Sequence, residues 1–175
     1  MEDKSQASNL VIRHYKPGDL EACRYLWFEL TDWHRDLYNS PTIGGENPGL
    51  LFDEHLTLVG ADNIWVAEVD GNVVGLTGLI SDVDEPELEP IVVNSSYRGL
   101  GIGRRLIETV MEAARQKGVR QLKVRPVGRN EQAIQFFHEQ GFNVIGHIEL
   151  FQDINAANQD VWRDGEKLAG KNFKV

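Results

Sequence analysis

Residues 98–104, Arg-Gly-Leu-Gly-Ile-Gly-Arg, have the composition of an anion-binding turn. They follow the β-branched pair Val92 and Val93 and precede a stretch with helical apolar spacing. Glycines can adopt positive φ and let backbone N–H groups approach a ligand closely, and the N-terminus of a helix directs its partial positive charge to the same place. Phosphate suits such a turn. The alternative is that the glycines merely make a tight connection between a strand and a helix.

Positive charge also gathers at this turn, because Arg98, Arg104 and Arg105 flank the glycines in a chain whose net charge is −9. Two familiar phosphate-binding patterns do not fit the turn. In G-x-G-x-x-G the third glycine would fall at Arg104 or at Leu106, and no Gly-Lys-Ser/Thr follows to make a P-loop. The sequence therefore supports neither of these nucleotide-binding classes and excludes neither.

The pattern that fits is R-x-x-G-x-G, with Arg98, Gly101 and Gly103 in the fixed positions. A second pattern, N-x-x-A-x-x-x-F-x-x-x-G-F, begins at Asn130 and ends at Phe142. With both in this order, the chain resembles the GNAT superfamily of acetyl-CoA-dependent N-acetyltransferases. The resemblance is specific over about residues 86–150 and architectural before them.

The resemblance implies that acetyl-CoA is the co-substrate and that loop amides hold its pyrophosphate. Its pantetheine arm is expected between two neighbouring parallel strands, residues 88–93 and 122–127, with a backbone N–H near Val92 or Val93 stabilising the oxyanion. The residues expected to bind the cofactor are Ile91, Val92, Val93, Arg98, Gly99, Leu100, Gly101, Ile102, Gly103, Arg104, Asn130 and Phe137.

Acetyl transfer requires a base, because a protonated amine has no lone pair. The candidates Glu85, Glu87 and Glu89 alternate along one predicted strand and so share a face. Glu87 comes first by its distance from Val93 in the family pattern, and Glu89 second. The alternative is a solvated acidic strand end.

Phe137 departs from the family, since many relatives have there a tyrosine that protonates the leaving thiolate. Either the thiolate leaves unprotonated or another group, such as Tyr97 or His138, supplies the proton. The substitution also favours an alternative function, a non-catalytic coenzyme A binding or regulatory module.

For the acceptor, carboxylates and aromatic rings gather near the end of the first predicted helix, as in a site for a cation. Glu29, Trp33 and His34 are the candidates, with Asp32 and Tyr38 nearby, and a half-buried surface is the competing interpretation. The acceptor is expected to be a small-molecule or peptide amine whose identity the sequence leaves open. Relatives often pair, so a homodimer is compatible with the resemblance.

Composition limits the remaining classes. The 175 residues suit one domain, and the net charge of −9 argues against nucleic acid as a partner. The N-terminus has no apolar core, and no apolar run reaches membrane-spanning length, so a cytoplasmic protein without a membrane partner is expected. Cys23 is expected to be a buried hydrophobe, and because the histidines lack metal-like spacing we expect no metal.

The periodicities predict a mixed α/β fold. Its sheet is expected to be mostly antiparallel, flanked by helices, with one parallel, splayed strand pair that holds the cofactor. Residues 1–9 are expected to be flexible, residues 10–153 to form one acetyltransferase domain, and residues 154–175 to be a tail that allows a terminal hairpin. The expected elements are strands at 10–13, 64–69, 73–80, 87–93, 121–127 and 142–153 and helices at 17–38, 50–58, 102–117 and 130–141.

Overall fold

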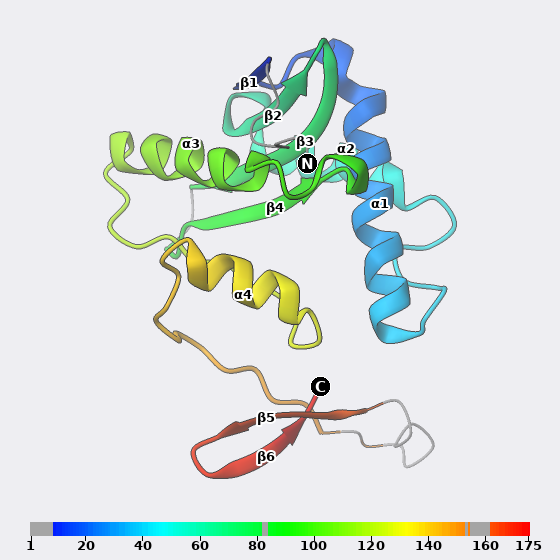
Figure 1. Cartoon of the computed structure of the whole chain (residues 1–175), viewed down its shortest axis with the longest axis vertical. Helices are drawn as coiled ribbons and strands as arrows, with labels where there is room; N and C mark the ends of the chain where they lie inside the picture. Colours follow the sequence, from blue (N-terminus) through cyan, green and yellow to red (C-terminus); the bar gives the residue numbers. More distant parts are fainter. Residues whose placement is uncertain (1–8, 82–83, 153, 155–161) are drawn as a thin grey trace, which may run out of the picture.

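A four-stranded antiparallel sheet forms the centre of the computed structural model, which describes residues 9–81, 84–152, 154 and 162–175. The strands follow one another in the order β1 (Leu10–His14), β2 (Ile64–Val69), β3 (Asn72–Ile80) and β4 (Glu87–Val93), as Figure 1 shows. Asp70 and Gly71 join β2 to β3 with φ values of 50° and 81°. Positive φ at both positions belongs to a tight hairpin turn, so the predicted hairpin is confirmed.

Helices cover both faces of this sheet. On one face α1 (Leu20–Tyr38) and α2 (Leu51–Val59) bury a cluster with Leu26, Phe52 and Val66, and on the other α3 (Ile102–Gln116) packs Leu106 and Ile107 against the sheet. Short 3₁₀ turns connect these elements at Pro17–Asp19, Pro48–Leu50, Ala61–Asn63 and Ser95–Tyr97. The periodicities had predicted all of these helices and strands to within a few residues.

The last third of the chain is built differently. Helix α4 (Glu131–Glu139) begins at Asn130, whose Oδ1 accepts a hydrogen bond from the backbone N of Ala133 at 3.0 Å. Strands β5 (Asp164–Leu168) and β6 (Lys171–Lys174) form a separate hairpin, which lies beyond α4 in Figure 1. None of the helices in the described residues is long and apolar enough to span a membrane.

Two predicted strands are wrong. Residues 121–127 pair with the sheet only through one parallel bridge between Lys123 and Glu87, and residues 142–152 belong to no strand. Asp153 lies outside the described residues. The predicted parallel pair is thus limited to this bridge, and the sheet itself is antiparallel.

Physical reasons for both errors are visible. Pro126 has no N–H to contribute to a ladder, and the apolar residues of 143–152 are exposed, with no covering surface, so their alternation alone does not make a strand. The boundaries proposed for the domain and its tail stay predictions.

Candidate acetyl-CoA cradle and active site

A strand, a turn and a helix form the candidate cradle. After β4 the chain passes the 3₁₀ turn Ser95–Tyr97 and reaches Gly99 and Gly101, whose φ values are 79° and 76°, before α3 begins at Ile102. A Cβ added at either glycine would meet no atom within 4 Å, so the space in front of the turn is open. The first helical backbone hydrogen bond runs from Arg105 N to Gly101 O at 3.2 Å. The backbone N–H groups of the residues before Arg105 therefore donate no hydrogen bond within the helix, and they can bind a ligand.

Gly103 serves a different purpose from its two neighbours. It lies within α3, and a Cβ there would come 3.0 Å from Cζ of Phe136. A side chain at this position would crowd the Phe136 ring, so close packing of α3 and α4, rather than positive φ, favours glycine here.

The three arginines at the turn already have partners within the protein. Arg98 Nε donates to Val93 O at 3.1 Å, and its guanidinium lies 6.0 Å from the ring of Trp33. Arg104 pairs with Glu108 at 2.8 Å, and Arg105 donates to Leu10 O at 3.4 Å. The cradle therefore depends mainly on backbone donors and the helix N-terminus.

The direction of the β4 amides narrows the choice of oxyanion donor. Asn94 N donates to Val74 O at 2.9 Å, and Val92 pairs with Leu76 in the same register. Because successive residues of an antiparallel strand turn their N–H groups to opposite sides, Val92 faces β3 while Ile91 and Val93 face the open edge of the sheet. Of the two residues that the sequence offered, Val92 and Val93, only Val93 directs its backbone N–H to the open edge. Val93 is thus the candidate oxyanion donor.

Three carboxylates and two cations form a ladder beside this edge. Arg125 Nε lies 2.6 Å from Glu87 Oε1, and Arg125 Nη2 lies 3.6 Å from Glu89 Oε2. Lys123 Nζ lies 2.9 Å from Glu85 Oε2 and 3.7 Å from Glu87 Oε2. Lys123 lowers the pKa of the Glu85 carboxyl, and the hydrogen bond to Glu87 raises the pKa of Arg125.

The two candidate bases, Glu87 and Glu89, differ in their exposure and in their ion pairs. The Glu87 side chain is only 6% exposed and both of its oxygens face cations, whereas the Glu89 side chain is 43% exposed. Sequence reasoning placed the three glutamates on one face but missed Lys123 and Arg125. Their own alternation along the neighbouring segment was the signal that could have found them.

A buried histidine also lies near the candidate bases. His55 of α2 is 7% exposed and packs against Trp27, with ring centroids 5.0 Å apart and the ring planes tilted by 46°. A Cβ added at Gly78 would lie 3.0 Å from His55 Nε2 and 2.6 Å from Glu89 O, at the point where the β3–β4 register shifts. Burial lowers the pKa of His55 to about 4, so the imidazole is neutral at physiological pH. The spacing of the histidines in the sequence bears only on metal binding, so it does not reveal this position of His55.

The candidate acceptor residues lie on α1, and two of them contact the segment that leads to the cradle. Glu29 accepts hydrogen bonds from Asn94 Nδ2 at 3.0 Å and from Ser95 Oγ at 3.4 Å, and Trp33 faces Arg98. His34 is half-buried, and desolvation lowers its pKa. Glu29 and Trp33 are thus brought to one place, next to the end of β4.

Phe137 and Cys23, two of the remaining candidate residues, are packed in the interior of the protein. Phe137 is 7% exposed and packs against the rings of Phe136 and Phe142, with centroids 5.5 and 5.7 Å away. Cys23 is fully buried, as predicted, which raises the pKa of its thiol to about 12. Among the described residues, no group of three or more His, Cys, Asp or Glu side chains could hold a metal ion.

Comparison with known proteins agrees with the motifs. The profile of the acetyltransferase (GNAT) family matches residues 27–142. A probable N-acetyltransferase, camello, of Xenopus tropicalis is 36% identical over 81 residues, which cover 45% of this chain and 37% of the relative. N-acetyltransferase 8 of Rattus norvegicus is 32% identical over 96 residues, covering 51% and 42%. The chain thus matches less than half the length of these curated relatives.

Among solved structures, the ribosomal-protein-alanine N-acetyltransferase of Brucella melitensis superimposes with a TM-score of 0.60 at 29% identity, covering 78% of this chain and 86% of that one. The profile match covers the cradle, the glutamate ladder, α4 and the candidate acceptor residues together. By this match and the arrangement of its cradle, the chain belongs to the GNAT family of acetyltransferases.

Proposed function

We propose that this protein transfers an acetyl group from acetyl-CoA directly to a primary amine within a ternary complex. The observation that carries the proposal is the cradle: an open turn with positive φ at Gly99 and Gly101, backed by the N-terminus of α3. Such a turn suits a pyrophosphate, because backbone N–H groups can converge on it without a side chain in the way. The family match supports the same cofactor.

The residues that would hold acetyl-CoA extend from the cradle along the open edge of β4. Amides of residues 99–104 would bind the pyrophosphate, and Ile91 and Val93 would offer backbone groups to the pantetheine arm. Acetyl-CoA supplies an activated thioester. The N–H of Val93 would face the charge that develops on the thioester oxygen, where a fixed donor has most effect on the rate.

Glu89 is the base that the geometry favours. A base must be within reach of an incoming amine, and Glu89 is the more exposed of the two candidates on β4. Glu87 would act through Arg125, which it holds at 2.6 Å, and so fix the charge beside Glu89. The proton would pass from the ammonium group to Glu89 directly or through one water molecule.

The leaving thiolate needs no phenol from α4. Phe137 has no proton to give and is packed in an apolar cluster. A thiol of pKa about 8.5 is a tolerable leaving group as its thiolate near neutral pH. We therefore assign no general acid to this protein.

The acceptor would enter beside α1, where Glu29 adds negative charge next to the end of β4. A cationic amine of a small molecule or of a peptide fits this charge. The alanine acetyltransferase of Brucella melitensis is named for an acceptor on a protein, which makes peptide N-termini a sensible first group to test.

The competing function is a module that binds coenzyme A without catalysis, and Phe137 is the observation that favours it. To separate the two, purified protein is incubated with acetyl-CoA and a panel of peptides, polyamines and amino acids, while released thiol and acetylated products are measured. Product with at least one amine supports the enzyme. Tight coenzyme A binding with no product from any amine supports the module.

A further inference from the structure

Strand β4 has an irregularity at the residue proposed as the base. The register of β4 on β3 shifts between Thr77 and Leu79. Glu89 and Pro90 of β4 therefore lie together opposite the single residue Gly78. Two residues against one make a β-bulge, which bends the strand and redirects the side chains beside it. Whatever holds this bulge also determines where the Glu89 carboxylate points.

His55 lies against the bulge from the side of the sheet that α1 and α2 cover. Its side chain is buried, and a Cβ added at Gly78 would come 3.0 Å from His55 Nε2 and 2.6 Å from Glu89 O. Both atoms thus border the space that the missing side chain of Gly78 leaves. The Glu89 carbonyl raises the pKa of the imidazole against the larger lowering by burial, as expected for a carbonyl oxygen that faces an imidazole nitrogen.

His55 Nε2 nevertheless has no hydrogen-bond partner among the described residues. Leaving a buried polar atom unpaired is costly, so such atoms are rare in folded proteins. Hydrogen bonds of active sites are often long without substrates and shorten when these bind. Glu89 O is the acceptor that Nε2 would reach if the bulge tightened.

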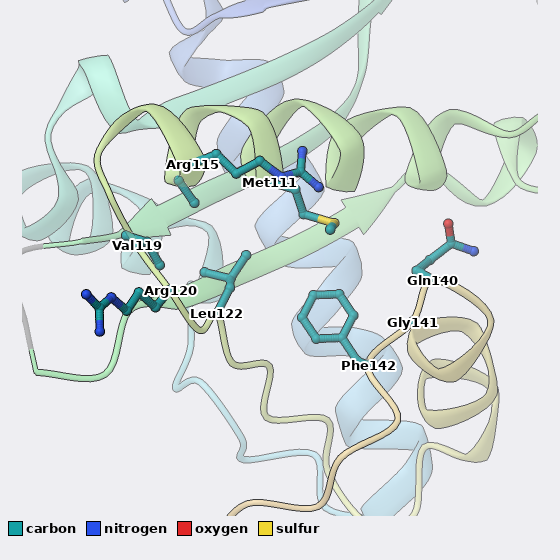
Figure 2. A pocket seen from close by; sticks show the side chains of 9 residues that line it. Met111, Arg115, Val119, Arg120, Leu122, Gln140, Gly141 and Phe142 are labelled. Carbon is teal, nitrogen blue, oxygen red and sulfur yellow. The ribbon is translucent and has the colours of Figure 1, made fainter.

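The opposite edge of β4 gives Glu89 a weaker support. Residues 121–127 meet β4 at a single bridge, and Arg125, which lies 3.6 Å from Glu89, has a side chain that is 67% exposed. A hollow of about 320 Å³ lies beside this segment, and the side chains of Leu122 and Phe142 border it in Figure 2. Because the segment is loosely packed, it cannot hold the bulge firmly.

The ring of His55, in contrast, is held on a rigid part of the molecule. It packs against Trp27 of α1 at 5.0 Å between centroids, and Trp27 in turn packs against Phe52 of α2 at 6.1 Å. Trp27 and Phe52 belong to the hydrophobic cluster between the helices and the sheet. His55 is therefore a fixed polar group in an apolar environment, next to the backbone of the candidate base.

We propose that His55 is a positioning residue for acetyl transfer: its Nε2–H donates to Glu89 O when the substrates bind, and so directs the Glu89 carboxylate toward the amine. This inference rests on the proposed function, in which Glu89 is the base. A carbonyl oxygen can only accept, so the imidazole must carry a proton on Nε2. Because burial keeps the ring neutral, it can donate this hydrogen bond without placing a charge beside the base.

The kinetic test compares two substitutions of His55. His55→Phe keeps a ring and removes the donor, whereas His55→Gln keeps an N–H donor near the position of Nε2. In His55→Phe, kcat is expected to fall about 100-fold, the size of a small misplacement of a reacting group, while the KM for acetyl-CoA stays unchanged. His55→Gln is expected to recover most of this loss. An unchanged kcat in His55→Phe, or no recovery in His55→Gln, would overturn the proposal.

Two further variants separate positioning from a general loss of packing. Phe52→Leu changes a buried ring of the same helix that contacts the same tryptophan, and it is expected to lower stability while kcat is kept. In a Glu89→Gln background, His55→Phe is expected to have almost no further effect, because the carboxylate that it positions is gone. Losses that multiply in the double variant would contradict an action through Glu89.

Nitrogen NMR of histidine-labelled protein at neutral pH tests the contact without turnover. The His55 signal, identified by its absence from His55→Gln, is expected to be that of a neutral ring with its proton on Nε2. A proton on Nδ1 alone would exclude donation to Glu89 O and overturn the proposal, even if the protein is active. The absence of product with every amine would instead refute the proposed function, whichever nitrogen carries the proton.

Discussion

Residues 10–116 and residues 117–175 have similar apolar patterns but opposite outcomes. In the first region every strand has a hydrogen-bonded neighbour, and helices cover both faces of the sheet. In the second, residues 121–127 make a single bridge and residues 143–152 are exposed. The difference teaches that an alternating apolar segment forms a strand only where a neighbouring segment supplies a partner edge, as the exposed β5–β6 hairpin also shows.

The candidate active site lies on the boundary between the two regions. β4 supplies the glutamates and the open backbone edge, and the weakly paired segment supplies Lys123 and Arg125. Variants on either side of this boundary can therefore show which region the chemistry depends on.

Glu89→Gln is expected to have the largest effect on activity. A lost general base costs roughly 10²- to 10⁴-fold in turnover, and the amide keeps the size of the side chain. Steady-state rates at saturating acetyl-CoA measure the effect, and calorimetry should show coenzyme A affinity unchanged. Glu85→Gln is the control, because its exposed ion pair with Lys123 contributes little. Equal losses in both variants would remove Glu89 from its proposed role.

Gly101→Val is expected to weaken coenzyme A binding by about 100-fold, since its side chain would occupy the open space of the cradle. Gly118→Val is a matched control: Gly118 has the same φ of 76°, and no atom lies within 4 Å of an added Cβ. Both variants carry the same strain, which costs about 1–2 kcal/mol. Titration calorimetry with coenzyme A therefore isolates the effect of the ligand. Equal affinities would place the pyrophosphate elsewhere.

We expect His55 to make the folding stability of the first region, residues 10–116, decrease in acid. Its pKa is about 4 in the folded protein and 6.5 in the reference state, so the unfolded chain binds more protons between these values. The contribution of neutral His55 to the free energy of unfolding is then fully present above pH 6.5. It is lost as the pH drops toward 4, by at most about 3 kcal/mol.

Urea unfolding at pH 7.0 and 4.5 measures this loss, and His55→Gln should reduce it. Asp19 has a lowered pKa because of Arg13, so its contribution is lost only below its usual value of 3.8 and does not overlap this window. An unchanged loss in the variant would show that His55 is not buried as described.

Sequence reasoning reached local features and missed relations across the chain. Asp70-Gly71 and Asn130 determine their own backbone geometry, so the hairpin and the cap could be predicted from a few neighbouring residues. The ion pairs of Lys123 and Arg125 join positions 38 residues apart in sequence, and their choice of partner depends on the register of two segments. The position of His55 depends on how α2 packs on the β3–β4 irregularity, which no local pattern encodes.

Substituting one tryptophan in each region compares how much each region contributes to the stability of the fold. Trp65 is 5% exposed within the core of the first region, whereas Trp162 precedes the hairpin of the second and contacts Arg129 at 5.8 Å. Trp65→Ala should cost about 3–5 kcal/mol of unfolding free energy, as for other buried aromatic residues. Trp162→Ala should cost only about 0.5–1 kcal/mol, the size of an exposed cation–π contact. Denaturant unfolding measures both, and a large loss in Trp162→Ala would mean that the hairpin belongs to the same cooperative unit as the sheet.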